Sequence, residues 1–320
     1  MKSLRLSVLA GVVATPAMAC DLCSVYSAMQ ARGEVEKGLT VGVAEQFTHY
    51  GTLQEEGHNA PNNLNQHLDS LISQLFAGYN FTDRLGAQVN VPIIYRSFLR
   101  ADVSGEIERG TESGVGDVSL VANLLAYRKA TKRFTFAWTV HGGLKLPTGG
   151  SDRLKEELDE LTAPPLPPGA AESGIHGHDL ALGSGSLDGI VGTGLFFRRQ
   201  RFFATANAQY AIRTKGDLEY RYANGLTWWG GPGIFLALTE YYTVALQLNV
   251  SGETKGRDTF QGVKADDTGI TSVFLGPQIS LTWGERLSAE LGADLPVSIE
   301  NTALQSVPDY RVRAAVNWRF

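Results

Sequence analysis

Two cysteines near the start of the chain are the first residues whose spacing suggests chemistry. Cys20 and Cys23 enclose two residues and directly follow Ala17-Met18-Ala19, a small-x-small pattern at which signal peptides are cleaved. A positively charged start and a short apolar core precede this pattern, as in a secretory signal. We therefore expect residues 1–19 to be a signal peptide and residues 20–37 to be a periplasmic N-terminal segment that carries the cysteine pair.

Three interpretations of the cysteine pair stay open. The two thiols would form a disulfide in the oxidising periplasm, or they would supply half of the ligands of a metal site. Alternatively, Cys20 would carry a lipid, although Ala17 stands where lipoprotein signals usually have leucine. Haem attachment is excluded because Ser24, and not histidine, follows Cys23.

A second candidate site lies in the middle of the chain. His176 and His178 are two positions apart and Asp179 follows them, within a long loop at 149–184. Two imidazoles and a carboxylate at this spacing are able to bind a transition metal. The competing interpretation is that these are solvated loop residues. We expect no cofactor, with a bound metal ion as the alternative.

The elements that position these residues are strands, and the last strand shows this most clearly. Its apolar face alternates strictly with a basic and polar face, and the chain ends on the aromatic Phe320. Side chains of a strand point alternately to its two faces, so this segment offers one face to lipid and the other to water. A C-terminal strand that ends in phenylalanine resembles the terminal strand of bacterial outer-membrane barrels, which their assembly machinery reads. The expected partners are therefore that machinery and outer-membrane lipid, and the alternative is an edge strand of a soluble sandwich.

Composition excludes several other classes of protein. The chain has 320 residues with Lys+Arg 28 and Asp+Glu 33, a net charge of -5, which argues against a nucleic-acid partner. It has no apolar run long enough for a spanning helix. A near-neutral mean hydropathy is compatible with a membrane barrel, because every second residue of a barrel strand faces water.

Strand-like segments repeat from residue 38 to the end of the chain. We expect strands at 38–53, 69–82, 85–101, 116–130, 133–148, 185–199, 201–219, 226–239, 241–256, 268–283, 286–302 and 309–320. Tight turns alternate with connections that are mostly longer, as in outer-membrane barrels. The sequence thus predicts an all-β fold: a transmembrane, antiparallel, up-and-down β-barrel of about 12 strands over 38–320. Its short turns and both termini would be periplasmic and its long loops external.

The alternation also predicts which charged side chains face the barrel interior. The expected interior residues, on the path of a substrate, are Arg96, His141, Lys145, Arg213, Glu290, Asp294, Arg311 and Arg313. Because the charges are mixed, we expect internal ion pairs and a narrow, partly filled interior. Two features depart from this alternation of apolar outward and polar inward residues. Glu45 falls on the outward face, and the strands at 185–199 and 226–239 are rich in glycine.

Aromatic residues cluster beside the tight turns, and the long loop has a pattern of its own. Pairs such as Phe196-Phe197 and Phe202-Phe203 predict an aromatic girdle at the periplasmic membrane surface. In loop 149–184, leucines at helical spacing precede a proline-rich run. This pattern predicts an amphipathic helix that folds into the barrel or covers its mouth, the alternative being a loose external loop.

Three glycine-rich motifs carry a family resemblance. They are Gly114-Val115-Gly116-Asp117, Leu144-Lys145-Leu146-Pro147-Thr148-Gly149 and Leu182-Gly183-Ser184-Gly185-Ser186-Leu187-Asp188. In this order the chain resembles, over roughly 70–320, the outer-membrane proteins named for the meta-pathway of phenol degradation. The resemblance implies a pore or channel for hydrophobic or aromatic small molecules. Bends and strand ends are the architectural alternative for each motif.

The expected function is passive uptake or efflux of a small molecule across the bacterial outer membrane. The alternative is a structural or metal- and redox-associated barrel that uses the cysteine pair and the loop histidines. We do not expect an enzyme, because serine and histidine are present but no spacing indicates a catalytic triad.

Overall fold

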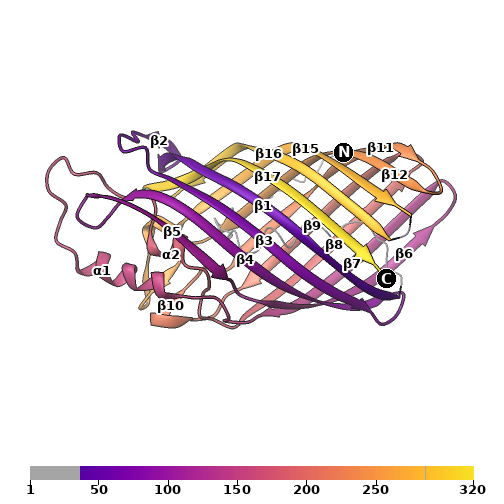
Figure 1. Cartoon of the computed structure of the whole chain (residues 1–320), viewed down its shortest axis with the longest axis horizontal. Coiled ribbons are helices and arrows are strands. Elements are labelled where there is room, and N and C mark those ends of the chain that lie inside the picture. Colours follow the sequence, from indigo (N-terminus) through magenta and orange to yellow (C-terminus); the bar gives the residue numbers. More distant parts are fainter. Residues whose placement is uncertain (1–36, 285) are drawn as a thin grey trace, which may run out of the picture.

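Twelve antiparallel strands close into a barrel in the computed structural model, which describes residues 37–284 and 286–320 (Figure 1). The first strand, β1 (Gly38–Glu55), pairs with the last, β17 (Gln305–Arg319), and this pairing closes the sheet. The expected up-and-down barrel is thereby confirmed. No helix within these described ranges is long and apolar enough to cross a membrane. The expected signal peptide and the cysteine pair lie outside the described residues.

The other barrel strands follow one another around the sheet in sequence order. They are β3 (His67–Asn80), β4 (Leu85–Ala101), β5 (Ile107–Val115), β6 (Ser119–Ala130), β7 (Phe134–Lys145), β8 (Asp188–Arg199), β9 (Phe202–Ile212), β11 (Gly225–Leu238), β12 (Tyr242–Lys255), β15 (Ile270–Trp283) and β16 (Leu287–Asn301). Short strands in the loops are β2 (His58–Ala60), β10 (Tyr220–Arg221), β13 (Thr259–Phe260) and β14 (Val263–Lys264).

β5 and β6 together form a single barrel strand, because both pair with β4. β6 takes the part of β4 nearer the tight turns and β5 the part nearer the long loops. The sequence predicted a loop over 102–115, and this prediction was wrong. The outward side chains of β5 include Arg109, Thr111 and Ser113, so its exterior is mainly polar and lacks the apolar face by which the other strands were found.

The two ends of the barrel differ as the loop lengths predict. We call the end with the tight connections the turn end and the other the loop end (Figure 1). Threonine hydroxyls of Thr82, Thr131 and Thr239 accept backbone N–H donors within three of the tight turns. At the same end, the backbone N–H of Phe320 donates to Leu39 at 2.9 Å. The start and the end of the barrel therefore meet at the turn end.

Alternation along the strands separates an apolar exterior from a polar interior. In β12, Leu246 and Leu248 lie 41% and 49% exposed on the outside, whereas Ala245 and Asn249, which precede and follow them, are buried inside. An exterior of this kind is stable against lipid, where the strands of a closed barrel pair with neighbours on both sides. β5 is an exception, because it pairs with β4 alone. Glu45 does point outward, and the hydroxyl of Ser73 donates to its carboxylate at 2.7 Å.

Glycines in the glycine-rich strands make room for interior side chains. A Cβ at Gly192 in β8 would lie 2.2 Å from Nε2 of His141, and a Cβ at Gly233 in β11 would lie 2.2 Å from the ring of Phe203. Both approaches are far shorter than any van der Waals contact. The departures from alternation are thus places where an interior ring occupies the space of a missing side chain.

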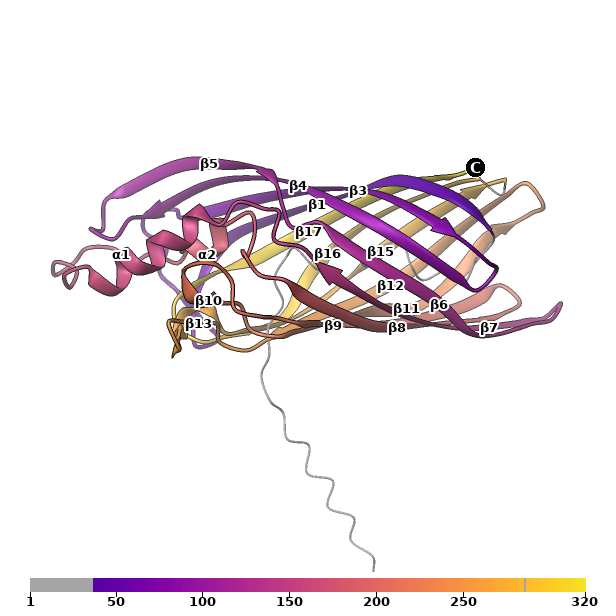
Figure 2. The ribbon, with the colours of Figure 1, turned by 90° about the horizontal axis from the view of Figure 1, so that it is seen from below.

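The long loop folds back onto the loop end, and we call its residues 149–184 the lid. It contains η3 (Asp152–Lys155), α1 (Glu156–Thr162) and α2 (Gly177–Leu180), and Figure 2 shows these helices between β5 and the β10–β13 pair. Leu154 and Leu180 are fully buried, the first among Tyr220, Tyr222 and Phe260. A helix in the lid is confirmed and the loop is not loose, but the predicted apolar face is only partly present, because Leu154 is buried in η3 whereas Leu158 of α1 is 42% exposed.

Candidate functional site

The three glycine-rich motifs meet in one buried network of charges inside the barrel. Lys145, at the end of β7, holds its ammonium group between the carboxylates of Asp117 and Asp188, 2.9 Å from Oδ2 of Asp188. The same group donates a hydrogen bond to the hydroxyl of Ser184. The lysine and both carboxylates are at most 5% exposed, so their charges are compensated by one another rather than by water.

This network also fastens both ends of the lid to the barrel wall. The carboxylate of Asp117 accepts the backbone N–H groups of Gly149 and Ser184, each at 3.0 Å. Asp188 accepts from the guanidinium of Arg213 at 2.8 Å. Residue types that looked merely turn-like in the sequence therefore have a joint architectural role at the root of the lid.

A second set of ion pairs lies further along the interior. Arg311 lies 3.0 Å from the carboxylate of Glu253, and Arg313 donates to Asp294 at 2.8 Å. Arg96 donates to the backbone carbonyl of Ala181 in the lid at 2.7 Å. These contacts agree with the expected internal ion pairs and partly filled interior.

Toward the turn end the interior opens into a cavity of about 270 Å³. Its wall carries four aromatic side chains, Phe196, Phe203, Trp229 and Phe235. The rings of Phe203 and Phe235 are 4.9 Å apart between centroids, and those of Phe196 and Phe203 are 6.2 Å apart. The prediction that Phe196 and Phe203 belong to the outer girdle was wrong. Of the neighbours Phe196 and Phe197, only Phe197 points outward, and of Phe202 and Phe203, only Phe202 does, as strand alternation requires.

Polar groups complete the wall of this cavity. They include the guanidinium groups of Arg128, Arg198 and Arg313, the carboxylate of Glu290, and amide and hydroxyl groups of neighbouring strands. The cavity thus combines an aromatic surface with a few cations, a composition typical of small-molecule sites.

Two smaller cavities continue from this one toward the lid. A cavity of about 20 Å³ shares Trp229 and Arg313 with the large cavity and is also lined by Glu253 and Arg311. A third, of about 100 Å³, shares Glu253 with it and reaches His178 and Ile175 under the lid. The small cavity beside the Arg311–Glu253 and Arg313–Asp294 pairs has space for about one water molecule.

A cluster of histidines and carboxylates lies within the lid and against the loop that carries Asp267. The imidazole Nδ1 of His178 is 2.9 Å from Glu157, and that of His176 is 3.2 Å from Glu160. Burial lowers the pKa of His176, but the hydrogen bond to Glu160 and the charge of Asp267 outweigh it and raise the pKa to about 9. Burial likewise lowers the pKa of His178, while the charges of Asp179 and Glu157 raise it well above its usual value.

The expected interior residues all point into the barrel, although they form separate groups. Lys145 and Arg213 belong to the buried network, Glu290 and Arg313 line the large cavity, and His141 lies between the two. Their role on a substrate path stays a prediction.

Sequence reasoning missed other members of these groups. The aromatic wall had a usable signal in strand alternation, which places Phe203 inside and its neighbour Phe202 outside. Glu157, Glu160 and Asp267 had none, because each meets the histidines only through the folded lid and a loop far along the chain.

Comparison with known proteins places the fold but not the family. No family model and no curated protein sequence matches the chain. The COG4313 outer membrane channel from Pseudomonas putida F1 matches with a TM-score of 0.62 and 18% identity, over 89% of this chain and 96% of that one. The fold is that of an outer-membrane β-barrel. Membership of the phenol-degradation family stays a prediction.

Two other solved structures match less closely. The translocator domain of the autotransporter NalP from Neisseria meningitidis has a TM-score of 0.42 and 12% identity, covering 93% of this chain and 92% of that one. The CymD monoaromatic hydrocarbon channel has a TM-score of 0.39 and 7% identity, covering 89% of each chain.

Proposed function

We propose that this protein is an outer-membrane channel that lets small molecules with an aromatic or apolar part cross passively. The observation that carries the proposal is the cavity of about 270 Å³ with its aromatic wall, which lies in line with two smaller cavities inside a closed barrel. A solute ring packed against Phe203 and Phe235 would gain aromatic contacts that a sugar does not.

The charges in the same wall favour acids among such solutes. Arg128, Arg198 and Arg313 line the cavity, and Glu290 is the carboxylate that lines it within the described part of the chain. A guanidinium fork binds a carboxylate through paired hydrogen bonds. We therefore propose small aromatic carboxylates, such as benzoate, as preferred solutes over neutral molecules of equal size.

The proposed location follows from the exterior surface. Its apolar side chains, such as Leu246 and Leu248, suit a bilayer, and rings at the turn end, such as Tyr241 and Trp283, are 75% and 60% exposed, as in an interfacial girdle. We place the turn end and both termini on the periplasmic side. Phe320 is 67% exposed there and remains our candidate for recognition by the barrel assembly machinery. We propose no catalytic reaction.

Flux into lipid vesicles tests the channel directly. Purified protein reconstituted in vesicles should let benzoate in faster than glucose, and Phe203→Ala should change the benzoate rate. The matched control is Phe202→Ala, which removes the neighbouring ring on the outside of the same strand. Absence of benzoate flux, or equal effects of the two substitutions, would overturn the proposal.

A further inference from the structure

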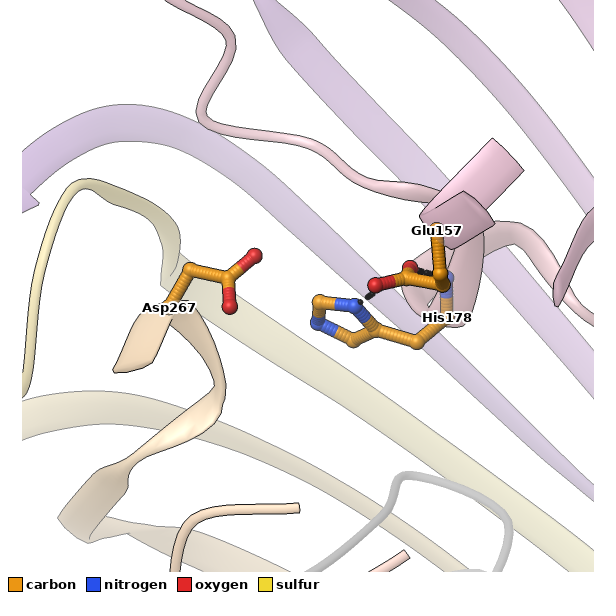
Figure 3. A group of neighbouring side chains, drawn as sticks. All are labelled: Glu157, His178 and Asp267. Carbon is orange, nitrogen blue, oxygen red and sulfur yellow. Dashed lines mark hydrogen bonds and ion pairs between the residues drawn. The ribbon is translucent and has the colours of Figure 1, made fainter. Parts of the chain in front are cut away.

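Two histidine–carboxylate pairs of the lid face a single carboxylate from another part of the chain. Glu157 and Glu160 belong to α1, whereas His178 lies in α2 and His176 just before it. Asp267 belongs to η5 (Asp266–Thr268), in the loop between β12 and β15. Figure 3 shows the ring of His178 between Glu157 and Asp267, which approach it from opposite sides.

The distances within this cluster suit metal coordination. One ligand atom each from Glu160, His176 and Asp267 lie within 4.8 Å of one another, and so do those of Glu157, His178 and Asp267. Nδ1 of His176 is 3.2 Å from Glu160 and 3.4 Å from Oδ2 of Asp267. Two atoms bound to one tetrahedral zinc ion at about 2.0–2.1 Å are roughly 3.3–3.4 Å apart, so these separations match two edges of a zinc tetrahedron.

The electrostatics of the cluster also favour a cation. The carboxylates of Glu157, Glu160, Asp179 and Asp267 surround only two imidazoles, so negative charge remains even when both rings are protonated. A surplus of carboxylates around two imidazoles suits a divalent cation, which supplies positive charge to the cluster.

One buried nitrogen of the cluster has no hydrogen-bond partner among the described residues. Nε2 of His176 is shielded from solvent and accepts or donates no hydrogen bond there. The rings of His176 and His178 stack in parallel, 5.7 Å apart with 4° between their planes. An unsatisfied buried polar atom is unusual in proteins and often marks the place of a water. Because Nε2 points away from Nδ1, the ring nitrogen that faces Glu160 and Asp267, the ion would bind Nδ1 and not this atom.

We propose that this cluster binds one divalent transition-metal ion at His176, Glu160 and Asp267, whose donor atoms have the separations given above. Imidazole nitrogen combined with carboxylate oxygen suits zinc and its neighbours in the series better than calcium or magnesium. Because Asp267 comes from the β12–β15 loop and the other ligands come from the lid, the ion ties the lid to the opposite rim of the barrel. Zinc binding to the site and flux through the barrel are measured separately, although His178 lines the cavity under the lid.

Zinc titration of the full-length protein in detergent tests this site. All variants carry Cys20→Ser and Cys23→Ser, so that both cysteine thiols of the sequence are removed as competing zinc ligands. After chelator treatment, calorimetry should give one bound Zn²⁺ per chain. Asp267→Asn should weaken binding at least tenfold, about 1.4 kcal/mol, because it replaces a charged ligand with a neutral one.

The control and a second variant keep the test decisive. His49→Gln alters another histidine–carboxylate pair, with Asp69, outside the lid and should leave zinc affinity unchanged. If Asp267→Asn does not fold, Glu160→Gln replaces it, with the same expected loss. Cobalt should replace zinc and give the visible absorption of a tetrahedral site in the parent protein. Absence of stoichiometric zinc binding, or binding that is equal in all variants, would overturn the proposal.

Discussion

The half of the barrel interior near the loop end is filled by paired charges and by the lid, whereas the half near the turn end keeps a cavity with aromatic side chains in its wall. Both halves belong to the same strands and share the same alternation. The difference arises from what lies opposite each strand residue. Lys145 meets Asp117 and Asp188, but Phe235 meets another ring and open space.

The two halves show two ways to arrange the interior of one barrel: the loop half is filled with paired charges, and the turn half keeps an open cavity. Charges that lose water are stable only when partners replace the solvent, so the loop half must be tightly packed and complete. Aromatic rings need no such partner, so the turn half is able to stay open. We expect substitutions in the loop half to cost mainly stability and those in the turn half to change mainly transport.

The largest expected effect comes from the buried network. Lys145→Ala leaves Asp117 and Asp188 buried without their shared cation and should lower the free energy of unfolding by about 3–5 kcal/mol. Denaturant unfolding of protein inserted in phospholipid vesicles measures it. Lys129→Ala, at an exposed lysine near the turn end, should stay within about 0.5 kcal/mol of the parent.

Arg313→Ala provides the counterpart in the turn half. Its partner Asp294 is also buried, but the adjoining cavity offers water to the unpaired carboxylate. Arg313→Ala should therefore lower the free energy of unfolding by less than Lys145→Ala does. A loss of equal size would show that the two halves do not differ in hydration, and the comparison would fail.

The next largest effect on stability is expected from a charge on the outward face of β12, compared with one on its inward face. Leu246→Arg places a charge on the outer surface and should cost about 2–4 kcal/mol if the site lies near the middle of the bilayer. Gln247→Arg, one residue further along β12, points into the cavity and should cost far less. Equal costs in the same vesicle unfolding assay would contradict the assignment of the two faces.

Much of the fold was predictable because lipid and water impose a period of two on every spanning strand. The twelve strands, the sorted loop lengths and the inward charges all follow from that constraint. β5 escaped prediction because most of its outward side chains are polar, while glutamate and glycine face inward. Without a lipid-facing stripe, a strand looks like a loop.

The functional sites were less predictable, for a different reason. His176 and His178 stood out by their spacing, but the carboxylates near them depend on the path of the lid and of a distant loop. Lys145 and Asp117 were found in separate motifs, and only the fold joins them. The aromatic wall was within reach of sequence reasoning, because Phe203 and Phe235 follow the same alternation as the charges.

A smaller effect is expected on solute binding in the turn half. Phe235→Ala removes one ring of the aromatic wall and should weaken benzoate binding by about 1 kcal/mol, roughly fivefold. Concentration-dependent block of conductance by benzoate in planar bilayers measures this. Leu236→Ala, its 52% exposed neighbour on the exterior, is the control and should leave the block unchanged.

The smallest expected effect lies on the outer surface near the loop end. His49 is 2.6 Å from Asp69, and their side chains are 30% and 36% exposed. If this height of the barrel is in water, His49→Ala should cost less than about 1 kcal/mol, because solvent already screens the pair. If it is in lipid, the same change would leave a carboxylate without a partner in an apolar medium and cost several times more. Unfolding of this variant in vesicles therefore shows whether the outer surface at His49 lies in water or in lipid. A large loss of unfolding free energy would mean that lipid reaches the level of the lid.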